Sequence, residues 1–291
     1  MRSLGELHPL SVFCYFAGVM SVSMLSLHPA LIILSLLGCL TLLLLHNQVK
    51  ARTLAASLGL FTALTLLNPL FYHDGITVLF VINDRPFTLE ALLYGAATAG
   101  MILSMVGWFR LLSRALTSDR LLYLLGRLSP RLALMVSMAL RFVPAFARQG
   151  QRIHQAQQGL GLYRGDNAPD ALRSRIREFS ILTTWALENG IVTADSMAAR
   201  GYGTGRRTSY AIFRFTRADA LFMLFSLALT AVTLTAILSS ALKFDYYPAL
   251  TLPADTLLAR AGLCAYSVLC LLPALMEGGE RIRWRCLQSR I

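Results

Sequence analysis

The sequence predicts an all-α, polytopic membrane protein with about six transmembrane spans and long amphipathic helices on the cytoplasmic side. Of its 291 residues, 56% are hydrophobic and only 14% are charged, whereas about a quarter of an ordinary soluble domain is charged. Several apolar stretches approach the roughly 20 residues needed to cross a bilayer core about 30 Å thick. The clearest of them, Pro29–Leu45, contains no charged residue.

Six apolar stretches are the predicted spans. They are Leu10–Leu27, Pro29–Leu45, Leu54–Tyr72, Leu89–Phe109, Ala220–Leu242 and Asp255–Met276. The chain then divides into a transmembrane region of about four spans (residues 1–109), a middle region (110–217), and a transmembrane region of about two spans with a basic tail (218–291). Because the first two spans are short and joined by His28-Pro29, a tilted or re-entrant pair stays open.

Six spans place both termini on the same side of the membrane, and the basic residues indicate which side. With the termini inside, 24 Lys and Arg lie inside and three lie outside. The positive-inside rule does not apply to the seventeen arginines of the long middle region. Without them, seven basic residues lie inside and three lie outside. Both termini are therefore predicted to be cytoplasmic.

The outer loop between the third and fourth spans predicts a short β-hairpin. A β-rich run at Ile76–Ile82 is followed by turn-forming residues at Asn83–Pro86.

The middle region contains seventeen Arg and only six acidic residues, so we do not expect it to contain a lipid-facing span. Its apolar residues recur at helical spacing, which predicts amphipathic helices lying against the membrane or against other helices. One helix should begin at Ser129-Pro130, a good N-cap and first position, and end at Gly159 and Gly161. A second should run from about Pro169 to Arg200, buried along much of its length.

The end of the second helix is a candidate contact site. The small residues in Met197-Ala198-Ala199 allow another helix to approach closely, and Gly201 ends the helix. Arg200 is left at the tip with five N–H donors, which suits an acidic groove on another protein. An ordinary capping cation that complements the helix dipole is the alternative interpretation.

Four stretches of the chain resemble the transmembrane T component, of the EcfT/CbiQ type, of energy-coupling factor (ECF) transporters. They are Leu67–Phe71, Thr88–Gly95, Leu140–Pro144 and Met197–Tyr202. The resemblance implies a subunit of an ABC importer for vitamins or metal ions, in the plasma membrane of a bacterium or archaeon. It also implies two cytoplasmic coupling helices, each with an Ala-Arg-Gly end docked on one of two ABC-type ATPase subunits, and a membrane-embedded substrate-binding S component as third partner.

The family's functional residues carry over only where the motifs match. Ala199-Arg200-Gly201, with Met197 and Ala198 before it, matches the second coupling signature, and Arg141 lies in the matching stretch Leu140–Pro144. The first signature should follow Gln157, but Leu160 stands at the position of the arginine. Either Arg152 or Arg164 replaces this arginine, or the first ATPase contact is weaker or differently built.

The sequence favours a passive role over chemistry in this chain. A P-loop needs Gly-x-x-x-x-Gly-Lys-Ser/Thr, and neither lysine, Lys50 or Lys243, stands in one, so ATP should bind to the partner ATPases. The cysteines and histidines show no metal or redox spacing, and we expect no catalytic residue, no cofactor and no metal site. The glycine-rich stretch Gly201–Arg207 follows a helix instead of a strand and is interpreted as a linker.

The sequence argues against two other functions and one other partner. A self-sufficient channel or secondary transporter usually places ionisable residues within its spans, whereas Glu90, Asp219 and Asp255 lie at predicted span ends. A membrane enzyme is disfavoured because no metalloprotease or serine-hydrolase motif is present. The net charge of +12 does not indicate nucleic acid, since 25 of the basic residues are arginine, which suits carboxylates or lipid head groups. GC-rich codon usage is the alternative explanation of that bias.

Overall fold

The computed structural model describes most of the chain. The described residues are 7–46, 51–72, 75–82, 85–162, 168–205, 213–247, 250–251 and 256–288. They form two compact units, one made of residues 1–121 with 213–291 and the other of residues 122–212.

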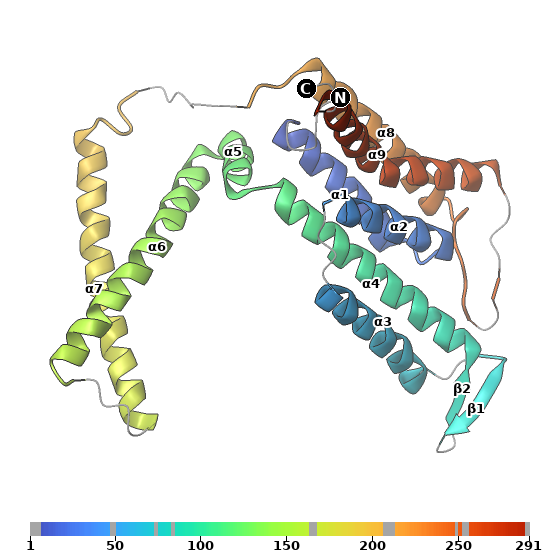
Figure 1. The fold of residues 1–291 in the computed structure, drawn as a ribbon, viewed down its shortest axis with the longest axis horizontal. Helices are drawn as coiled ribbons and strands as arrows, with labels where there is room; N and C mark the ends of the chain where they lie inside the picture. Colours follow the sequence, from blue (N-terminus) through green and yellow to red (C-terminus); the bar gives the residue numbers. More distant parts are fainter. Residues whose placement is uncertain are drawn as a thin grey trace. The chain divides into compact units, whose positions relative to one another are not determined.

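The first unit is a helical bundle. Its helices are α1 (Pro9–Leu25), α2 (Pro29–Leu45), α3 (Ala51–Phe71), α4 (Leu89–Ala115), α8 (Arg217–Leu238) and α9 (Leu257–Gln288). Helix α4 packs against α1, α2 and α3, while α8 packs against α1 and α9, and α9 against α2. Figure 1 shows these helices side by side, with segments from both ends of the chain in one bundle.

The core of this bundle joins early and late helices through aromatic and hydroxyl side chains. The indole of Trp108 in α4 is fully buried and donates a hydrogen bond to Ser35 Oγ in α2 at 2.9 Å. Ser23 Oγ in α1 lies 3.1 Å from Ser35 Oγ and 2.7 Å from the Tyr266 hydroxyl in α9. Because buried hydroxyls inside an apolar bundle need partners, this network links four helices in one arrangement.

Glycine permits a close contact between α2 and α9. A Cβ atom added to Gly38 in α2 would lie 2.7 Å from Cys270 Cβ and 3.1 Å from its carbonyl oxygen in α9. No larger side chain fits without moving a helix, because part of the obstacle is backbone. The α2 and α9 backbones therefore pack together through a position where only hydrogen fits.

A buried carboxylate holds the segment that returns to the bundle. Asp219 in the first turn of α8 accepts hydrogen bonds from Thr216 N at 2.9 Å, Thr216 Oγ1 at 2.6 Å and His8 N at 2.9 Å. The first bond, together with the bond that the Thr216 side chain accepts from the Asp219 N–H, forms a capping box at the start of α8. The third joins this helix start to the start of α1, 211 residues earlier.

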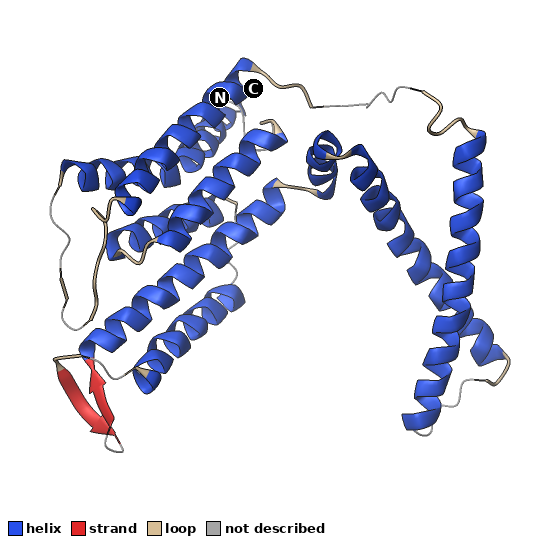
Figure 2. Cartoon of the chain, turned by 180° about the vertical axis from the view of Figure 1, so that it is seen from behind, coloured by secondary structure: helices blue, strands red, loops and turns tan. Residues whose placement is uncertain are grey.

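The predicted hairpin is confirmed. Strands β1 (Val78–Ile82) and β2 (Arg85–Thr88) pair antiparallel, and β2 leads directly into α4 (Figure 2). The carboxylate of Glu90, buried at the start of α4, accepts hydrogen bonds from the Thr77 N–H at 3.2 Å and the Thr77 hydroxyl at 2.5 Å. The base of the hairpin is thus fastened to α4.

Five helices of the described chain are long and apolar enough to cross a membrane by length and composition, namely α3, α4, α6 (Pro130–Gly159), α8 and Leu257–Gly279 of α9. Four of them coincide with predicted spans. The first two predicted spans are also apolar helices, but each is only 17 residues long. Helix α6 corrects our expectation for the middle region, because its first half contains only two of the region's many arginines, Arg131 and Arg141.

The second unit consists mainly of α6 and α7 (Ala168–Ala199), preceded by α5 (Ser118–Leu128), which begins just before the division between the units. Both long helices start and end within two residues of the predicted positions. The prediction that α7 is buried along much of its length is wrong, because Ser174 is its only buried residue. Helical spacing identified its apolar face correctly but did not reveal whether this chain covers that face.

Candidate functional site: two crossed helices and their ends

Helices α6 and α7 cross within the second unit (Figure 1). The Phe146 ring in α6 packs edge-on against the Trp185 ring in α7, with centroids 5.8 Å apart, and stacks on Phe142 at 5.7 Å. Leu160 lies fourteen residues beyond Phe146, and Arg200 lies fifteen beyond Trp185. At 1.5 Å per residue, the two helix ends lie about 21 and about 22 Å from this aromatic contact. The helix segments between the contact and the two ends are therefore nearly equal in length.

Both helices end in the same backbone motif. At the end of α7, Tyr202 N donates to the Met197 carbonyl at 3.0 Å and Gly201 N donates to the Ala198 carbonyl at 2.9 Å. Gly201 has a φ of +76°. These two bonds around a left-handed glycine constitute a Schellman motif, which satisfies the last carbonyls of the helix.

The end of α6 repeats this motif bond for bond. Leu162 N donates to the Gln157 carbonyl at 3.0 Å, Gly161 N donates to the Gln158 carbonyl at 3.0 Å, and Gly161 has a φ of +64°. Leu160 is the C-cap of α6, and Arg200 holds the same place in α7. The sequence-based alignment of Leu160 with Arg200 therefore has a structural basis in the cap itself.

The two ends present different chemistry on this shared backbone. Arg200 is exposed, and the neighbouring Tyr202 is 43% exposed. At the other end Leu160 is 73% exposed and Leu162 47% exposed. One end therefore presents a cation with an aromatic ring, and the other presents a pair of leucines.

The structure brings the predicted site residues together in two groups. Met197, Ala198, Ala199, Arg200 and Gly201 form the α7 end, and Gln157 and Leu160 belong to the α6 end. The Gln157 side chain is buried, with no hydrogen-bond partner among the described residues. Arg141 belongs to neither end, because it precedes Leu160 by nineteen residues, or about 28 Å along the helix.

The two suggested substitutes for the missing arginine can be placed only in part. Arg152 precedes Leu160 by eight residues, which puts its Cα about 12 Å back along α6. That is too far from the cap to take the place of Arg200. Arg164 lies outside the described residues.

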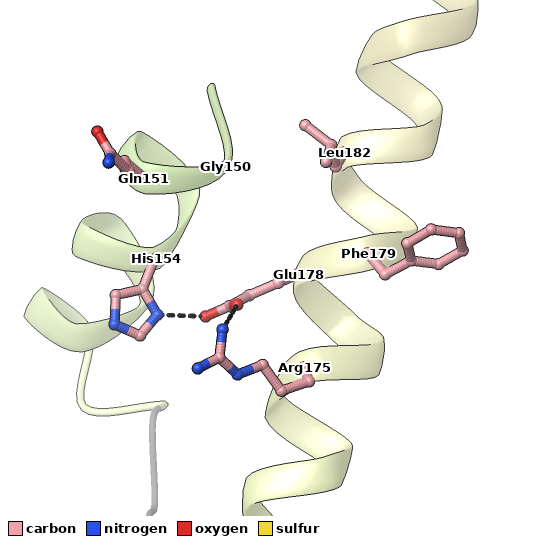
Figure 3. Close-up of a pocket in the computed structure, with 7 residues that line it drawn as sticks. All are labelled: Gly150, Gln151, His154, Arg175, Glu178, Phe179 and Leu182. Atoms are coloured by element: carbon pink, nitrogen blue, oxygen red, sulfur yellow. Dashed lines mark hydrogen bonds and ion pairs between the residues drawn. The ribbon is translucent and has the colours of Figure 1, made fainter. Parts of the chain in front are cut away.

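A polar network fastens the α6 end to α7 (Figure 3). The sequence did not predict this network. His154 Nδ1 in α6 lies 2.6 Å from Glu178 Oε1 in α7, while Arg175 Nη1 lies 3.7 Å from Glu178 Oε2. The Gln158 amide nitrogen lies 3.1 Å from His154 Nε2. Figure 3 shows His154 and Arg175 converging on this carboxylate from the two helices.

A signal for this network was present in the spacing. His154 and Glu178 are equidistant from residue 166 in the turn between the helices, and Phe146 and Trp185 are nearly so. Residues equidistant from the turn of an antiparallel helix pair tend to face each other. The network borders a hollow of about 510 Å³ lined also by Gly150, Gln151, Phe179 and Leu182.

The two helices leave an unusually large apolar surface uncovered in this chain. The exposed apolar side chains of α6 are Leu132, Met135, Val136, Leu140 and Val143, and those of α7 are Leu172, Ile176, Phe179, Ile181, Leu187, Ile191 and Val192. A soluble surface rarely exposes so many large apolar side chains together, and such surfaces mark contacts with proteins or membrane. Among the described residues, no group of His, Cys, Asp and Glu is arranged to hold a metal ion.

Comparison with known proteins shows similarity to one protein family and to one bacterial protein. The family model described as CbiQ, cobalt transport protein, matches residues 4–211. An uncharacterized protein of Mycoplasma genitalium is 30% identical over 162 residues, an alignment that covers 51% of this chain and 39% of that protein. The chain thus matches well under half the length of that relative.

Proposed function

The chain belongs to the CbiQ cobalt transport protein family, and we propose that it is the transmembrane coupling subunit of an ECF-type ABC importer. As a member of that family with five apolar helices of spanning length, it is a multi-pass membrane protein and a component of a transporter. In the proposed importer it is not catalytic. It transmits the movement of two ATP-binding ATPase subunits to a membrane-embedded S component, which binds a vitamin or metal ion.

The observation that carries this proposal is the pair of matched helix ends. Two similar ATPase subunits offer two similar grooves related by approximate two-fold symmetry, so a single chain that engages both needs two similar protrusions. Helices α6 and α7 end in the same cap, and their ends lie about 21 and about 22 Å from the point where the helices cross. A channel or a secondary transporter has no use for such a pair.

Arg200 is the proposed anchor in the groove of one ATPase. The guanidinium is exposed at a helix end, and among the described residues it forms no ion pair within this chain. The planar guanidinium group can donate two parallel hydrogen bonds to one carboxylate. Arginine is also enriched among the residues that dominate the binding energy of interfaces. The groove is accordingly acidic. Ala198 and Ala199 allow it to close around the helix.

Leu160 and Leu162 are the proposed anchors in the other ATPase. They occupy the α6 cap where the family signature has its arginine, and Arg152 is too far back to act there. Two exposed leucines gain free energy by entering an apolar pocket and offer nothing to a carboxylate. The two ATPase contacts therefore differ in chemistry while sharing one backbone geometry.

The exposed apolar surface along α6 and α7 is the proposed contact for the S component and the bilayer. Its position around the crossing means that a change in the distance between the two helix ends alters the surface on which the S component rests. Residues 1–109 and 218–291 are the proposed transmembrane regions and 110–217 the proposed coupling region. The chain lies in a bacterial or archaeal plasma membrane with both termini in the cytoplasm.

The test is purification of the tagged chain from its native membrane, with identification of the associated proteins and measurement of ATP-driven uptake after reconstitution. We expect two subunits with P-loop motifs and one small membrane protein that binds the substrate. Arg200→Glu should leave the chain in the membrane and abolish both ATPase association and uptake. Uptake by the chain alone in liposomes would contradict the proposal. Unchanged ATPase association in Arg200→Glu would also contradict it.

A further inference from the structure

A second hollow lies at the crossing of α6 and α7, on the opposite side of the Phe146–Trp185 contact from the His154 network. Its volume is about 220 Å³, and it is lined by Met138, Arg141, Phe142, Ala145, Arg148, Asn189 and Thr193. Hollows that take drug-sized ligands generally start at about 300 Å³. This hollow therefore suits a single compact group.

The described residues supply no acidic side chain that balances the charge in this hollow. Arg141 and Arg148 are seven residues apart, which is only about 20° short of two full helical turns, so they lie on one face of α6. None of the lining side chains is acidic, and neither arginine forms an ion pair within the described residues. The nearest acids in sequence on α7, Glu188 and Asp195, do not line the hollow.

The remaining lining residues specify an oxygen-rich, amphiphilic ligand. Asn189 and Thr193 are one turn apart on α7, and both line the hollow. The Thr193 hydroxyl donates to the Asn189 carbonyl at 2.7 Å, so the Asn189 amide is the polar donor that α7 adds to the arginines. Met138, Phe142 and Ala145 supply the apolar part of the lining. Arginine side chains with an amide donor recognise phosphate oxygens, and the apolar part suits the hydrocarbon attached to a lipid head group.

The composition of α6 places this hollow where apolar surface gives way to charge. The first half of the helix is apolar enough to lie in a membrane, and none of its spanning window is buried. Beyond Arg148 the exposed side of the helix continues through Gln151 and Arg152. Basic residues at such a boundary attract anionic lipid head groups.

We propose that the hollow between Arg141, Arg148 and Asn189 binds the phosphate-bearing head group of an anionic phospholipid, with its acyl chains along the exposed apolar side of α6. Bound there, the lipid holds the crossing of α6 and α7 at the membrane surface. The site is separate from both helix ends and does not depend on ATPase docking.

The experiment is native mass spectrometry of the full-length chain in detergent, titrated with phosphatidylglycerol or with phosphatidylcholine of the same acyl chains. We expect one phosphatidylglycerol to bind at least about tenfold more tightly than phosphatidylcholine, a difference of about 1.4 kcal/mol. The double variant Arg141→Gln with Arg148→Gln should lose that preference. Arg152→Gln, which removes an exposed arginine of the same helix outside the hollow, should keep it.

Two further measurements make the result decisive. Asn189→Leu leaves every charge in place and should still weaken phosphatidylglycerol binding, which separates a built site from general attraction to a basic helix. Inorganic phosphate in millimolar excess should not displace the lipid. Equal binding of the two lipids, equal losses in Arg152→Gln and the double variant, or full displacement by inorganic phosphate would each overturn the proposal.

Discussion

Exchanging the side chains at the two helix ends tests the proposed function most directly. The single variants are Leu160→Arg and Arg200→Leu, and the double variant combines them. Because both residues are C-caps of the same Schellman motif, with a left-handed glycine next to each, either side chain fits either cap. The exchange therefore changes the chemistry of the ends while leaving the helix terminations intact.

The expected magnitudes follow from exposure and charge. Complete burial of a leucine side chain is worth about 1.5–3 kcal/mol, and Leu160 is 73% exposed, so its docking contributes about 1–2 kcal/mol. Leu160→Ala should thus weaken binding of the ATPase at the α6 end roughly five- to thirtyfold. Arginine at the centre of an interface commonly contributes about 2 kcal/mol or more, so Arg200→Leu should weaken binding at the α7 end at least about thirtyfold.

The sign of the Leu160→Arg effect distinguishes the two accounts of the α6 end. In an apolar pocket the new charge would be buried without a partner, and binding should weaken by more than it does in Leu160→Ala. In an acidic groove like the one proposed for Arg200, the new arginine would gain a carboxylate partner, and binding should strengthen.

The assay is binding of the purified ATPase pair, without nucleotide, to the chain held in nanodiscs on a surface, measured by biolayer interferometry. Gln155→Ala, which removes an exposed side chain five residues before the α6 cap and leaves the cap residue in place, serves as the control and should bind like the wild type. Tighter binding of Leu160→Arg than of the wild type would refute the apolar pocket while leaving the proposed function standing. No loss in either single variant would refute both helix ends as ATPase contacts.

Three further predictions concern two positions in the bundle and the cap of α7. Asp219→Asn should lower the melting temperature in detergent, because an amide cannot accept all three hydrogen bonds. The free energy of unfolding should fall by about 2 kcal/mol. Asp245→Asn, a change at an exposed carboxylate, should leave the stability unchanged. Gly38→Ala should cost about 1–3 kcal/mol through its clash, while Gly59→Ala, which meets nothing within 4 Å, should be neutral or stabilising. Gly201→Ala should cost about 1 kcal/mol by forcing a side chain into the left-handed region, detected as faster hydrogen exchange at the α7 end.

Features encoded within a few residues of one another could be predicted from the sequence. Pro29 and Pro130 begin their helices because proline suits a first helical turn. Gly161 and Gly201 mark the two caps because only glycine enters the left-handed region without cost. Helix positions and the hairpin followed from such local rules, whereas the correspondence of Leu160 with Arg200 came from the resemblance to a family.

Contacts between distant residues could not be predicted in the same way. The bond from His8 N to Asp219 spans 211 residues, and Asp219 alone looked like an ordinary residue at a span end. His154 likewise appeared to be an isolated histidine, because its partner Glu178 lies on the next helix. Periodicity shows which face of a helix is apolar, but not what covers that face.

The exposed faces of α6 and α7 also explain why the crossing, and not only the ends, matters for the proposed function. Where two helices cross at one contact, the distance between their ends depends on the angle at which they cross. The Phe146–Trp185 contact lies at the crossing, and the His154–Glu178 pair lies between it and the α6 end. We expect the helices to rotate about the aromatic contact, with the polar pair limiting how far they slide. Closure of two docked ATPases would therefore reach the S component as a rotation of the apolar surfaces around the crossing. A His154→Ala variant that keeps full ATPase binding but loses uptake would support this division of roles, whereas equal retention of both would show that the pair does not carry the movement.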